Sequence, residues 1–458
     1  MENTRKPQSA DPVARVAAHL REYLFPGAHV VLGLSGGMDS VCLLHILAEL
    51  AAQLRFSLRA VHVNHGISSN AGDWATFCEA LCRRLGIPLA VESVDVAPYR
   101  HLGPEAAARA ARWSALLSHD AEFLALAQHR DDQAETLLLQ LMRGAGPAGL
   151  AGMAGHALPA RFKGGAGQHQ LRVLRPLLDW GRIDIEAFVR SRNLEWVEDE
   201  SNSHTALDRN FLRHRVLPEL SGRYPHAAAM IARSAGILGE ASDLLTQLGL
   251  QDIAGIESGD ALELRGLRAL GEARARNALR AYCHVRDIPS PGFARIHEIW
   301  LQLREPRQDS RICIAWEGHV LRRYRDRIYI ERHESRDAAG FEGARWEGEP
   351  SLPLMALDGM LHFQPEEGRG LSVEKLRSAP VTIRLRSGGE RLRIDTRKPH
   401  RTLKNLWQEK GTPPWRRDRL PLLYCADELV CVPGIGDNVD WRAASGERGL
   451  IVTWQPFI

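Results

Sequence analysis

The sequence has few cysteines, few aromatic residues and no long apolar segment. Seven cysteines among 458 residues are scattered and odd in number, which is typical of reduced intracellular thiols and argues against a disulfide framework. No apolar run approaches the ~18 residues that span a bilayer, and the polar start MENTRKPQSADP does not resemble a signal peptide. We therefore expect a cytoplasmic protein without a membrane partner.

The length and composition are those of a multidomain globular protein. At roughly 150 residues per domain the chain has room for about three domains, and 44% hydrophobic with 25% charged residues argues against disorder. Changes of composition along the chain suggest its boundaries. We predict a catalytic domain at 1–222, a mainly helical middle domain at 223–340, a linker at 341–370 and a basic C-terminal domain at 371–458.

The first 220 residues alternate between strand-like and helix-like segments. Apolar runs of strand length lie at 29–34, 58–65, 89–96 and 121–129, and helical stretches lie between them at 40–54, 73–86 and 105–119. This alternation predicts an α/β fold, in which a parallel, doubly wound sheet is covered by helices. The middle domain and a small α+β C-terminal domain follow it.

A glycine-rich loop joins the first predicted strand to an apolar helix. Its sequence is SGGMDS (35–40). Adjacent glycines allow close approach to an anion, and amide and hydroxyl groups at a helix N-terminus can bind phosphate. The GK[ST] ending of a Walker A loop is absent, as is GxGxxG, so the loop suits pyrophosphate release better than γ-phosphoryl transfer or dinucleotide binding. The alternative is a glycine turn whose helix is capped by Asp39 or Ser40.

The loop resembles the pyrophosphatase loop (SGGxDS) of the N-type ATP pyrophosphatases. These enzymes adenylate a substrate and release pyrophosphate, and the loop alone does not distinguish among them. Asp39 is suited to hold Mg²⁺ beside the phosphates. The second strand ends in HVNHG (62–66), and at this strand tip, which includes His62, the backbone could read adenine. The predicted nucleotide-binding residues are Ser35, Gly36, Gly37, Met38, Asp39, Ser40 and His62.

A second cluster follows the fourth predicted strand, in AQHRDDQAETLLLQLMRGAGPAGLAGM. Asp132 and Glu135 are three residues apart and share a helix face; carboxylates in a first turn also simply complement the helix dipole. With Asp131 they could bind Mg²⁺ or an incoming ammonium. The run resembles the HxDDQAET and LxRGxGxxGLxGM segments of tRNA(Ile)-lysidine synthetases. Arg130 departs from that pattern, because the family usually has a small residue there.

Two further segments resemble the same family and contribute arginines. The helix at 105–113 resembles its ExxARxxRY string, which implies RNA or phosphate contacts for Arg109 and Arg112, although a solvated helix face explains them equally well. RNFLRHRVLP (209–218) resembles its RNxxRHxxLP block and contains Arg209, Asn210 and Arg213. Arginines four residues apart on a helix repel unless an anion lies between them, and we expect a phosphate there.

Positive charge is concentrated near the C-terminus. Residues 384–419 contain twelve Lys or Arg and four acidic residues, an excess that indicates a phosphate-backbone partner. Trp415 is a candidate for stacking on an unpaired base, whereas Trp407 is expected to be core. RTLKNLWQEKGTPPWRRDRLPLL resembles the family's C-terminal tRNA-binding domain, which implies substrate contacts for Arg401 and Lys404.

The resemblance, which covers the first 220 and last 80 residues, implies a specific reaction. It is ATP-dependent ligation of L-lysine to C2 of the wobble cytidine of tRNA(Ile) with a CAU anticodon, through an adenylated tRNA. ATP and Mg²⁺ would be required, with Asp39, Asp132 and Glu135 catalytic and Asp39 and Asp131 as metal ligands. Two alternatives remain, a tRNA thiolation enzyme, against which the lack of CxxC counts, and a non-catalytic RNA-binding protein. Monomer and homodimer both remain open.

Overall fold

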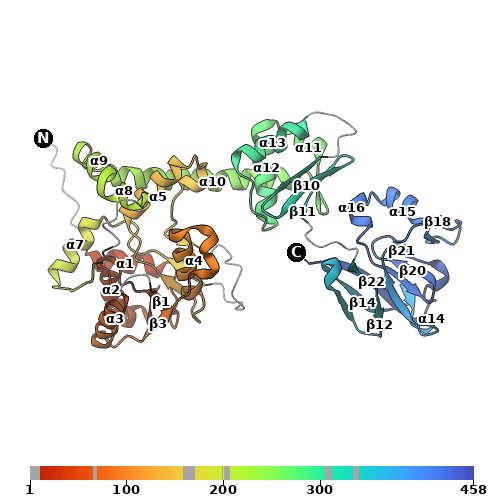
Figure 1. The fold of residues 1–458 in the computed structure, drawn as a ribbon, viewed down its shortest axis with the longest axis horizontal. Helices are drawn as coiled ribbons and strands as arrows, with labels where there is room; N and C mark the ends of the chain where they lie inside the picture. The colour runs from red at the N-terminus through yellow and green to blue at the C-terminus, as the bar shows by residue number, and fades with distance from the viewer. Residues whose placement is uncertain are drawn as a thin grey trace. The chain divides into compact units, whose positions relative to one another are not determined.

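A computed structural model describes residues 11–64, 66, 70–157, 171–198, 200, 207–304, 312–333 and 340–457. The chain divides into two units, Met1–Leu248 and Gly249–Ile458, and Figure 1 shows their elements. Among the described helices, none has the length and apolarity that a bilayer crossing requires.

The first unit is built on a six-stranded sheet in the order β3-β2-β1-β4-β6-β5. All neighbouring strands run parallel except β5, which is antiparallel to β6. The strands are β1 (His29–Gly33), β2 (Ser57–Asn64), β3 (Leu89–Ser93), β4 (Phe123–Ala125), β5 (His156–Ala157) and β6 (Arg172–Leu174). The chain order reverses between β1 and β4, which is where ligands bind in open α/β sheets. The α/β prediction is confirmed.

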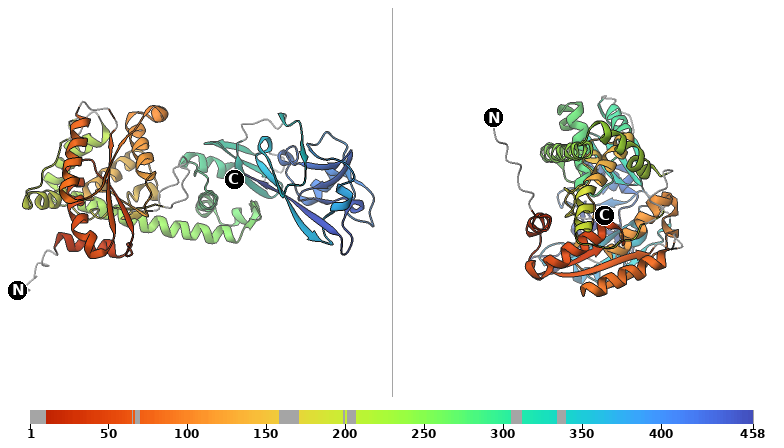
Figure 2. Two further views of the ribbon diagram at one scale, coloured as in Figure 1. Left: turned by 90° about the horizontal axis from the view of Figure 1, so that it is seen from below. Right: turned by 90° about the vertical axis from the view of Figure 1, so that its left-hand side faces the viewer.

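Helices cover both faces of this sheet (Figure 2). One apolar core joins the sheet to α1 (Pro12–Arg21), α2 (Met38–Leu54), α3 (Ala71–Leu85) and α7 (Arg182–Ser191). A second core on the other face includes Val31, Leu124 and Val173 from the strands and Leu116 from α4 (Pro104–Leu117). Successive strand residues therefore point into different cores, which fixes the direction of the side chains that follow each strand.

Further helices, most of them short, follow the sheet elements along the chain. They are α5 (Arg130–Met142), α6 (Pro147–Leu150), α8 (Asp208–Phe211), a π-helix (Leu212–Val216), α9 (Leu217–Arg223) and the long α10 (Ala227–Ala254). A 3-10 turn, Ala97–Leu102, precedes α4. The π-helix matters because such local widening of a helix often occurs at functional sites.

The second unit begins with helices and an antiparallel sheet. The predicted helical character is seen in α11 (Leu264–Ala269), α12 (Glu272–Val285) and α13 (Phe293–Arg304). A five-stranded sheet packs with them that the sequence did not suggest, in the order β7-β8-β11-β10-β9. Its strands are β7 (Glu257–Ser258), β8 (Ala261–Glu263), β9 (Cys313–Trp316), β10 (His319–Tyr324) and β11 (Arg327–Arg332).

Residues 341–370 are not a linker, and that prediction is wrong. They contain β12 (Ala344–Trp346), β13 (Ser351–Leu354) and β14 (Gly359–Glu367), and all nine residues of β14 pair with β22 (Arg448–Pro456). The acidic and glycine-bearing composition that suggested a linker belongs instead to sheet edges and turns of the C-terminal α+β part. Its other elements are α14 (Val373–Leu376), α15 (Leu403–Lys410), α16 (Pro414–Arg417), β15 (Leu371–Ser372), β16 (Val381–Arg384), β17 (Arg391–Leu392), β18 (Arg401–Thr402), β19 (Leu422–Cys425), β20 (Glu428–Val432) and β21 (Gly436–Asp437).

Candidate active site

The phosphate-binding loop lies at the carboxyl end of β1 and heads α2, as the sequence predicts. Gly36 has a φ of +85°, and a Cβ there would lie 2.8 Å from Val197 Cγ2, so the position requires glycine on two grounds. Gly37 has ordinary extended dihedrals as the N-cap of α2. The two glycines therefore differ, since only Gly36 needs backbone freedom.

Two hydroxyl groups close the loop. Ser40 Oγ donates to Gly37 O at 2.9 Å and lies 3.1 Å from Ser35 Oγ, which accepts from Gly37 N at 3.3 Å. The amides of Met38 and its neighbours open the helix, where the first N–H groups have no intrahelical acceptor and the helix dipole is positive. The loop is thus preformed to bind an anion.

His62 is buried beneath this loop. Its Nδ1 lies 2.9 Å from Leu34 O and 3.6 Å from Cys78 Sγ. Burial lowers the pKa of His62, and the hydrogen bond to the Leu34 carbonyl offsets part of that effect, so the neutral imidazole donates Nδ1–H. This hydrogen bond holds the carbonyl of Leu34, the residue that directly precedes the phosphate-binding loop. Only 3% of His62 is exposed, so its imidazole is closed to a nucleotide.

His129, at the start of α5, is surrounded by carboxylates. Its Nε2 lies 3.6 Å from Asp39 Oδ2 and 3.5 Å from Asp132 Oδ2, and its Nδ1 lies 3.6 Å from Asp131 Oδ2. Burial lowers the pKa of His129, but the three carboxylates raise it, to about 10. His129 Nδ1 accepts from Asp131 N at 3.2 Å, and its Nε2 faces Asp39 and Asp132, so this ring links the phosphate loop to α5.

Asp132 and Glu135 share one helix face, as predicted, and there they bind two arginines. Arg209 Nε lies 2.7 Å from Glu135 Oε2, and Arg213 Nε lies 2.6 Å from Glu135 Oε1. The Nη2 atoms of both arginines donate to Asp132 Oδ1, at 3.1 and 3.0 Å. The anion expected between Arg209 and Arg213 is thus this carboxylate pair and not a phosphate.

The local backbone explains how the two arginines converge. Arg209 lies in α8 and Arg213 in the π-helix that continues it. Burial lowers the pKa of Arg213, but the hydrogen bond and charge of Glu135 outweigh burial and raise that pKa above its ordinary value. Asn210, between them, is buried. Glu135 is 1% exposed and Asp132 is 13% exposed, so only Asp132 keeps some access to a substrate.

The charges of this cluster do not cancel. Four carboxylates, from Asp39, Asp131, Asp132 and Glu135, face two guanidinium groups and the His129 ring, so negative charge is in excess. Asp39 Oδ1 is buried without a hydrogen-bond partner in the described residues. That oxygen, beside the phosphate loop, fits a Mg²⁺ shared with phosphate oxygens.

Asp131 does not fit the predicted metal position. Its Oδ2 accepts from Arg182 N at 2.9 Å and approaches the His129 nitrogen that faces away from Asp39. Within the described residues no three His, Cys, Asp or Glu side chains converge as a metal site. Asp39 and Asp131 therefore lie apart, and Asp131 orients His129 in this conformation.

The remaining predicted site residues of the first unit are Arg109 and Arg112, which are exposed on α4. The sequence analysis missed Arg175, directly after β6. Its Nη1 donates to Ala154 O at 2.8 Å and its Nε donates to Gln128 Oε1. Burial, and then the charge of Arg109, lowers the pKa of Arg175 to about 10. The signal was present in VLRPLL, where an arginine directly follows a buried apolar run.

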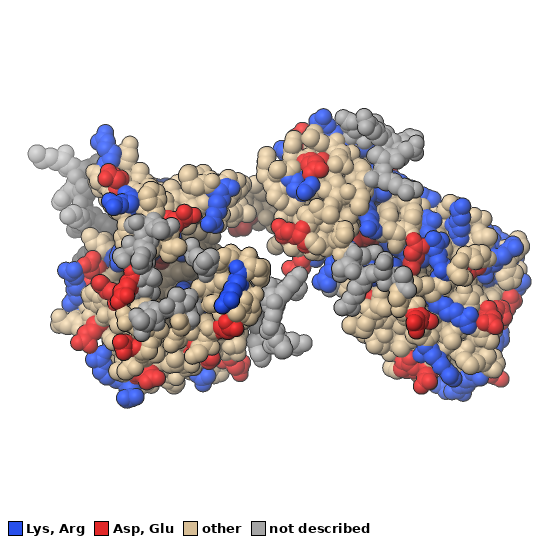
Figure 3. Space-filling model, viewed as in Figure 1, with Lys and Arg blue, Asp and Glu red and all other residues tan. Residues whose placement is uncertain are grey.

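Much of the basic charge near the C-terminus is used within the chain. Arg401 forms a two-hydrogen-bond ion pair with Glu409, at 2.6 Å each. Within the described residues no carboxylate lies at ion-pair distance from Arg397, Lys404 or Lys410, which are exposed. In Figure 3 the Lys and Arg of this part are interspersed with acidic side chains.

Trp415 does not present an open ring for base stacking. Its Nε1 donates to Glu331 Oε2 at 2.7 Å, and its ring meets Tyr324 and Tyr329 edge to face, at centroid distances of 6.2 and 5.8 Å. The Arg322 guanidinium lies 5.3 Å from the same ring. A base could stack on Trp415 only if this packing opened. Trp407 is buried core, as expected.

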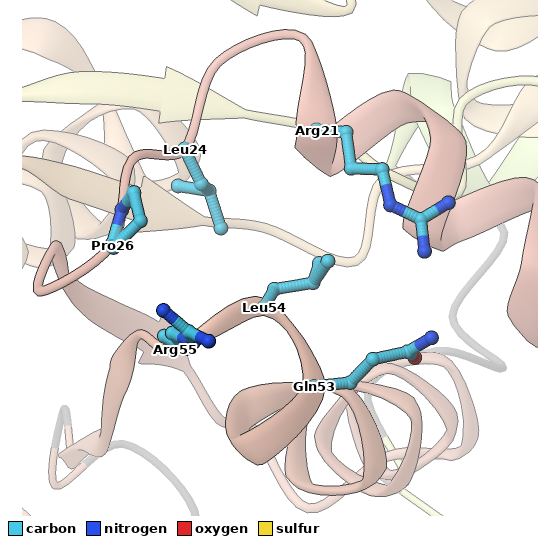
Figure 4. Close-up of a pocket in the computed structure, with 6 residues that line it drawn as sticks. All are labelled: Arg21, Leu24, Pro26, Gln53, Leu54 and Arg55. Atoms are coloured by element: carbon cyan, nitrogen blue, oxygen red, sulfur yellow. The ribbon is translucent and has the colours of Figure 1, made fainter.

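Two pockets lie away from the phosphate loop. One of about 320 Å³ is lined by Arg21, Leu24, Pro26, Gln53, Leu54 and Arg55 (Figure 4). These residues precede β1 and β2 and so lie at the opposite edge of the sheet from residues 35–40. Another, of about 290 Å³, includes Arg401 and Glu409 in the C-terminal part.

Comparison with known proteins assigns this arrangement to a family. A PP-loop domain model matches residues 10–220, a TilS substrate binding domain model matches 262–329, and a TilS substrate C-terminal domain model matches 381–454. The tRNA(Ile)-lysidine synthase of Nitrosomonas europaea is 40% identical over 438 residues, which cover 96% of this chain and 94% of the relative. The chain belongs to the tRNA(Ile)-lysidine synthase family.

Other members of the family match equally broadly. The tRNA(Ile)-lysidine synthase of Methylococcus capsulatus is 38% identical, covering 95% of this chain and 98% of the relative. The family match at 262–329 falls in the region for which the sequence showed no quotable resemblance. A solved U34-tRNA thiolase, NcsA from Methanococcus maripaludis, covers 50% of this chain at 20% identity with a TM-score of 0.41, too distant to indicate a shared reaction.

Proposed function

We propose that the chain ligates L-lysine to C2 of the wobble cytidine of tRNA(Ile) with a CAU anticodon, at the expense of ATP. The observation that carries the proposal is the 3.6 Å approach of Asp39, in the phosphate loop, to His129, at the head of α5. It brings residues 35–40 and the carboxylates of α5 to one edge of the sheet, which supports an ATP site beside an amine site. The family membership supplies the reaction class.

The proposed reaction has two steps. Cytosine O2 attacks the α-phosphorus, and pyrophosphate leaves into the loop formed by Ser35, Gly36, Gly37 and Ser40. The lysine ε-amine then attacks C2 and displaces AMP. Mg²⁺ held by Asp39 would offset charge on the phosphates when bound, and the amides at the head of α2 would stabilise the departing pyrophosphate.

The second step requires a neutral amine. A free lysine ε-amine has a pKa near 10.4, so deprotonation at pH 7 costs roughly 4.6 kcal/mol. We propose that Asp132 receives the ammonium, because it is the more accessible carboxylate of its pair. Glu135, which is enclosed by Arg209 and Arg213, would position Asp132 and not contact the substrate.

The C-terminal part is proposed to bind the tRNA. Arg397, Lys404 and Lys410 are exposed cations for which the described residues provide no carboxylate partner, and phosphate contacts of such residues make binding steeply salt-dependent. Arg401 contributes only if its ion pair with Glu409 opens. A cytoplasmic location is proposed because the substrate is a tRNA.

A homodimer is proposed from one surface of α10. Met230, Ile237 and Leu244 are exposed and seven residues apart, so they form one stripe. In an antiparallel pairing centred on Ile237, Met230 would meet Leu244 of a second copy, with Arg233 near Glu240. Light scattering of the wild type and Ile237→Glu tests this: a dimer that becomes a monomer supports it, and a wild-type monomer at micromolar concentration refutes it.

The activity is tested by incubating the chain with ATP, labelled lysine and transcribed tRNA(Ile) with a CAU anticodon. Mass analysis of the nucleosides should show cytidine increased by one lysine residue, with AMP and pyrophosphate formed in equal amounts. The same tRNA with a GAU anticodon is the control and should give neither. Pyrophosphate release without a lysine adduct, or incorporation of sulfur, would refute the proposal.

A further inference from the structure

Arg175 is a buried cation whose two described hydrogen bonds go to neutral groups. Only 8% of the residue is exposed. Its guanidinium donates to the Gln128 side chain and to the Ala154 carbonyl, and neither acceptor carries a charge. An arginine keeps its proton in proteins, so this site holds a full positive charge removed from water.

The described residues supply no carboxylate partner for Arg175. Within the described residues no carboxylate lies at ion-pair distance from it, in contrast to Arg209 and Arg213 a short way along the chain. The sequence 158–170 that leads into β6 contains no aspartate or glutamate. Since a buried charge is costly unless it is paired, the fold keeps this cation for an anion from outside.

The direction of Arg175 fits a ligand site. Val173 belongs to the core on the α4 side of the sheet, and alternation along β6 sends the side chain of Arg175 to that side, beyond the strand's carboxyl end. Arg109 is exposed on α4. Gln128, which holds Arg175 Nε, is adjacent in sequence to His129 of the carboxylate cluster. Arg109 therefore lies near Arg175, and Gln128 connects Arg175 to the residue that begins the carboxylate cluster.

We infer that Arg175, with Arg109 beside it, binds an anionic group of a substrate other than ATP, through carboxylate or phosphate oxygens. ATP is excluded as the source of this anion because its phosphates are assigned to the loop at 35–40. Two sources of this anion exist for the proposed function, on which the inference rests: the α-carboxylate of free lysine and a backbone phosphate of the tRNA. Gln128 and Ala154 hold the guanidinium through its Nε and Nη1 atoms.

Two measurements on Arg175→Met distinguish the sources. If lysine supplies the anion, kcat/KM for lysine falls about 10- to 100-fold, the effect of losing a charged hydrogen bond, while the rate with cadaverine, which lacks the carboxylate, is unchanged. If tRNA supplies it, the slope of log Kd for tRNA against log salt decreases by about 0.7–0.9, one phosphate contact, while the lysine-to-cadaverine ratio is unchanged.

Three further variants distinguish loss of a ligand contact from misfolding. Arg172→Met removes an exposed arginine at the start of the same strand and should change neither measurement. Arg175→Lys keeps the charge and should recover part of the loss. If Arg175→Met does not fold, Arg109→Met, on the exposed face of α4, is used in its place. It should change the same quantity, the lysine-to-cadaverine ratio or the salt slope, by a smaller factor.

The inference is overturned if both the lysine-to-cadaverine ratio and the salt slope remain at wild-type values in the folded variants, or if only the KM for ATP changes. Failure of the proposed function is a separate outcome, because wild-type protein would then form no lysine adduct. The salt slope for tRNA can be measured whether or not the adduct forms.

Discussion

The guanidinium of Arg130 occupies the space that a Cβ on Gly181 would require. An added methyl there would overlap with Arg130 Nη2. Arg130 reaches this position from the head of α5, with Nη1 3.4 Å from Asp179 O and Nη2 3.6 Å from Asp184 Oδ2. The next residue, Asp131, accepts from Arg182 N. Two successive residues of α5 thus fix the start of α7, and through Asp131 they fix His129.

Gly181→Ala should therefore disturb the site by displacing Arg130. We expect pyrophosphate release to fall several-fold in Gly181→Ala and in Arg130→Ala, because small displacements of reacting groups are costly. The double variant should be no worse than either single one, a coupling of about 0.5–3 kcal/mol. The measurement is kcat at saturating ATP and tRNA.

Gly236→Ala is the control for the added methyl, since a Cβ there meets nothing within 4 Å. It should leave kcat unchanged. Strictly additive effects of Gly181→Ala and Arg130→Ala would show that the arginine does not act through this loop.

This pair shows what sequence alone could and could not predict. Spacing placed the strands and helices of the first unit, because alternation of apolar runs is local, and it placed residues 35–40 at a helix head. The resemblance to the family's motif also marked Arg130 as a departure. Its partner near Gly181 lies about 50 residues away on another helix, and nothing in local spacing joins the two.

The same limit explains the other errors. The distance between Arg209 and Arg213 correctly predicted an intervening anion, but two carboxylates from α5 fill that place, a long-range pairing that local pattern cannot show. The composition of 341–370 suggested a linker because β14 is recognisable only with β22, about 90 residues later. Arg175 was missed although an arginine follows the apolar run of β6, because its burial and its lack of a carboxylate partner among the described residues depend on long-range packing.

Gly36→Ala should strongly reduce kcat/KM for ATP. The left-handed backbone costs an alanine about 1–2 kcal/mol, and its Cβ would also press on Val197 Cγ2. We expect kcat/KM for ATP to fall by more than about tenfold, and Val197→Ala in the same chain to restore part of it. Gly86→Ala is the matched control, because Gly86 has a φ of +67° in open space; it should cost stability but leave the KM for ATP unchanged. No recovery with Val197→Ala would contradict the steric argument.

Asp39→Asn should raise the Mg²⁺ requirement more than Asp131→Asn does. Asp39 has the buried, unpaired oxygen beside the loop, whereas Asp131 is held by Arg182 N and His129. A lost carboxylate ligand weakens Mg²⁺ binding, so the Mg²⁺ concentration for half-maximal pyrophosphate release should rise in Asp39→Asn, with a smaller change in Asp131→Asn. Equal shifts in the two variants would return Asp131 to the metal site.

Glu135→Gln should destabilise the first unit. Removing one member of a fully buried pair costs roughly 3–5 kcal/mol; because Arg209 and Arg213 are about a quarter exposed, we expect about 2–4 kcal/mol from denaturant unfolding. Glu49→Gln breaks an exposed pair with Arg192 and should cost below about 1 kcal/mol. Similar losses in the two variants would mean that the cluster is no more than a surface pair.

Cys313 should be the one thiol that reacts in the native protein, and its loss should not affect catalysis. All seven cysteines are free and only Cys313 is exposed. Burial raises the pKa of Cys42, Cys78 and Cys283 to about 12, so these thiols remain protonated and unreactive at pH 8, because the thiolate is the nucleophile. Labelling with Ellman's reagent should modify one thiol per chain, and none in Cys313→Ser.

A thiolation enzyme would need an accessible cysteine to carry sulfur. Full lysine incorporation by Cys313→Ser would therefore exclude that chemistry at this residue, whereas loss of lysine incorporation would reopen the thiolation alternative.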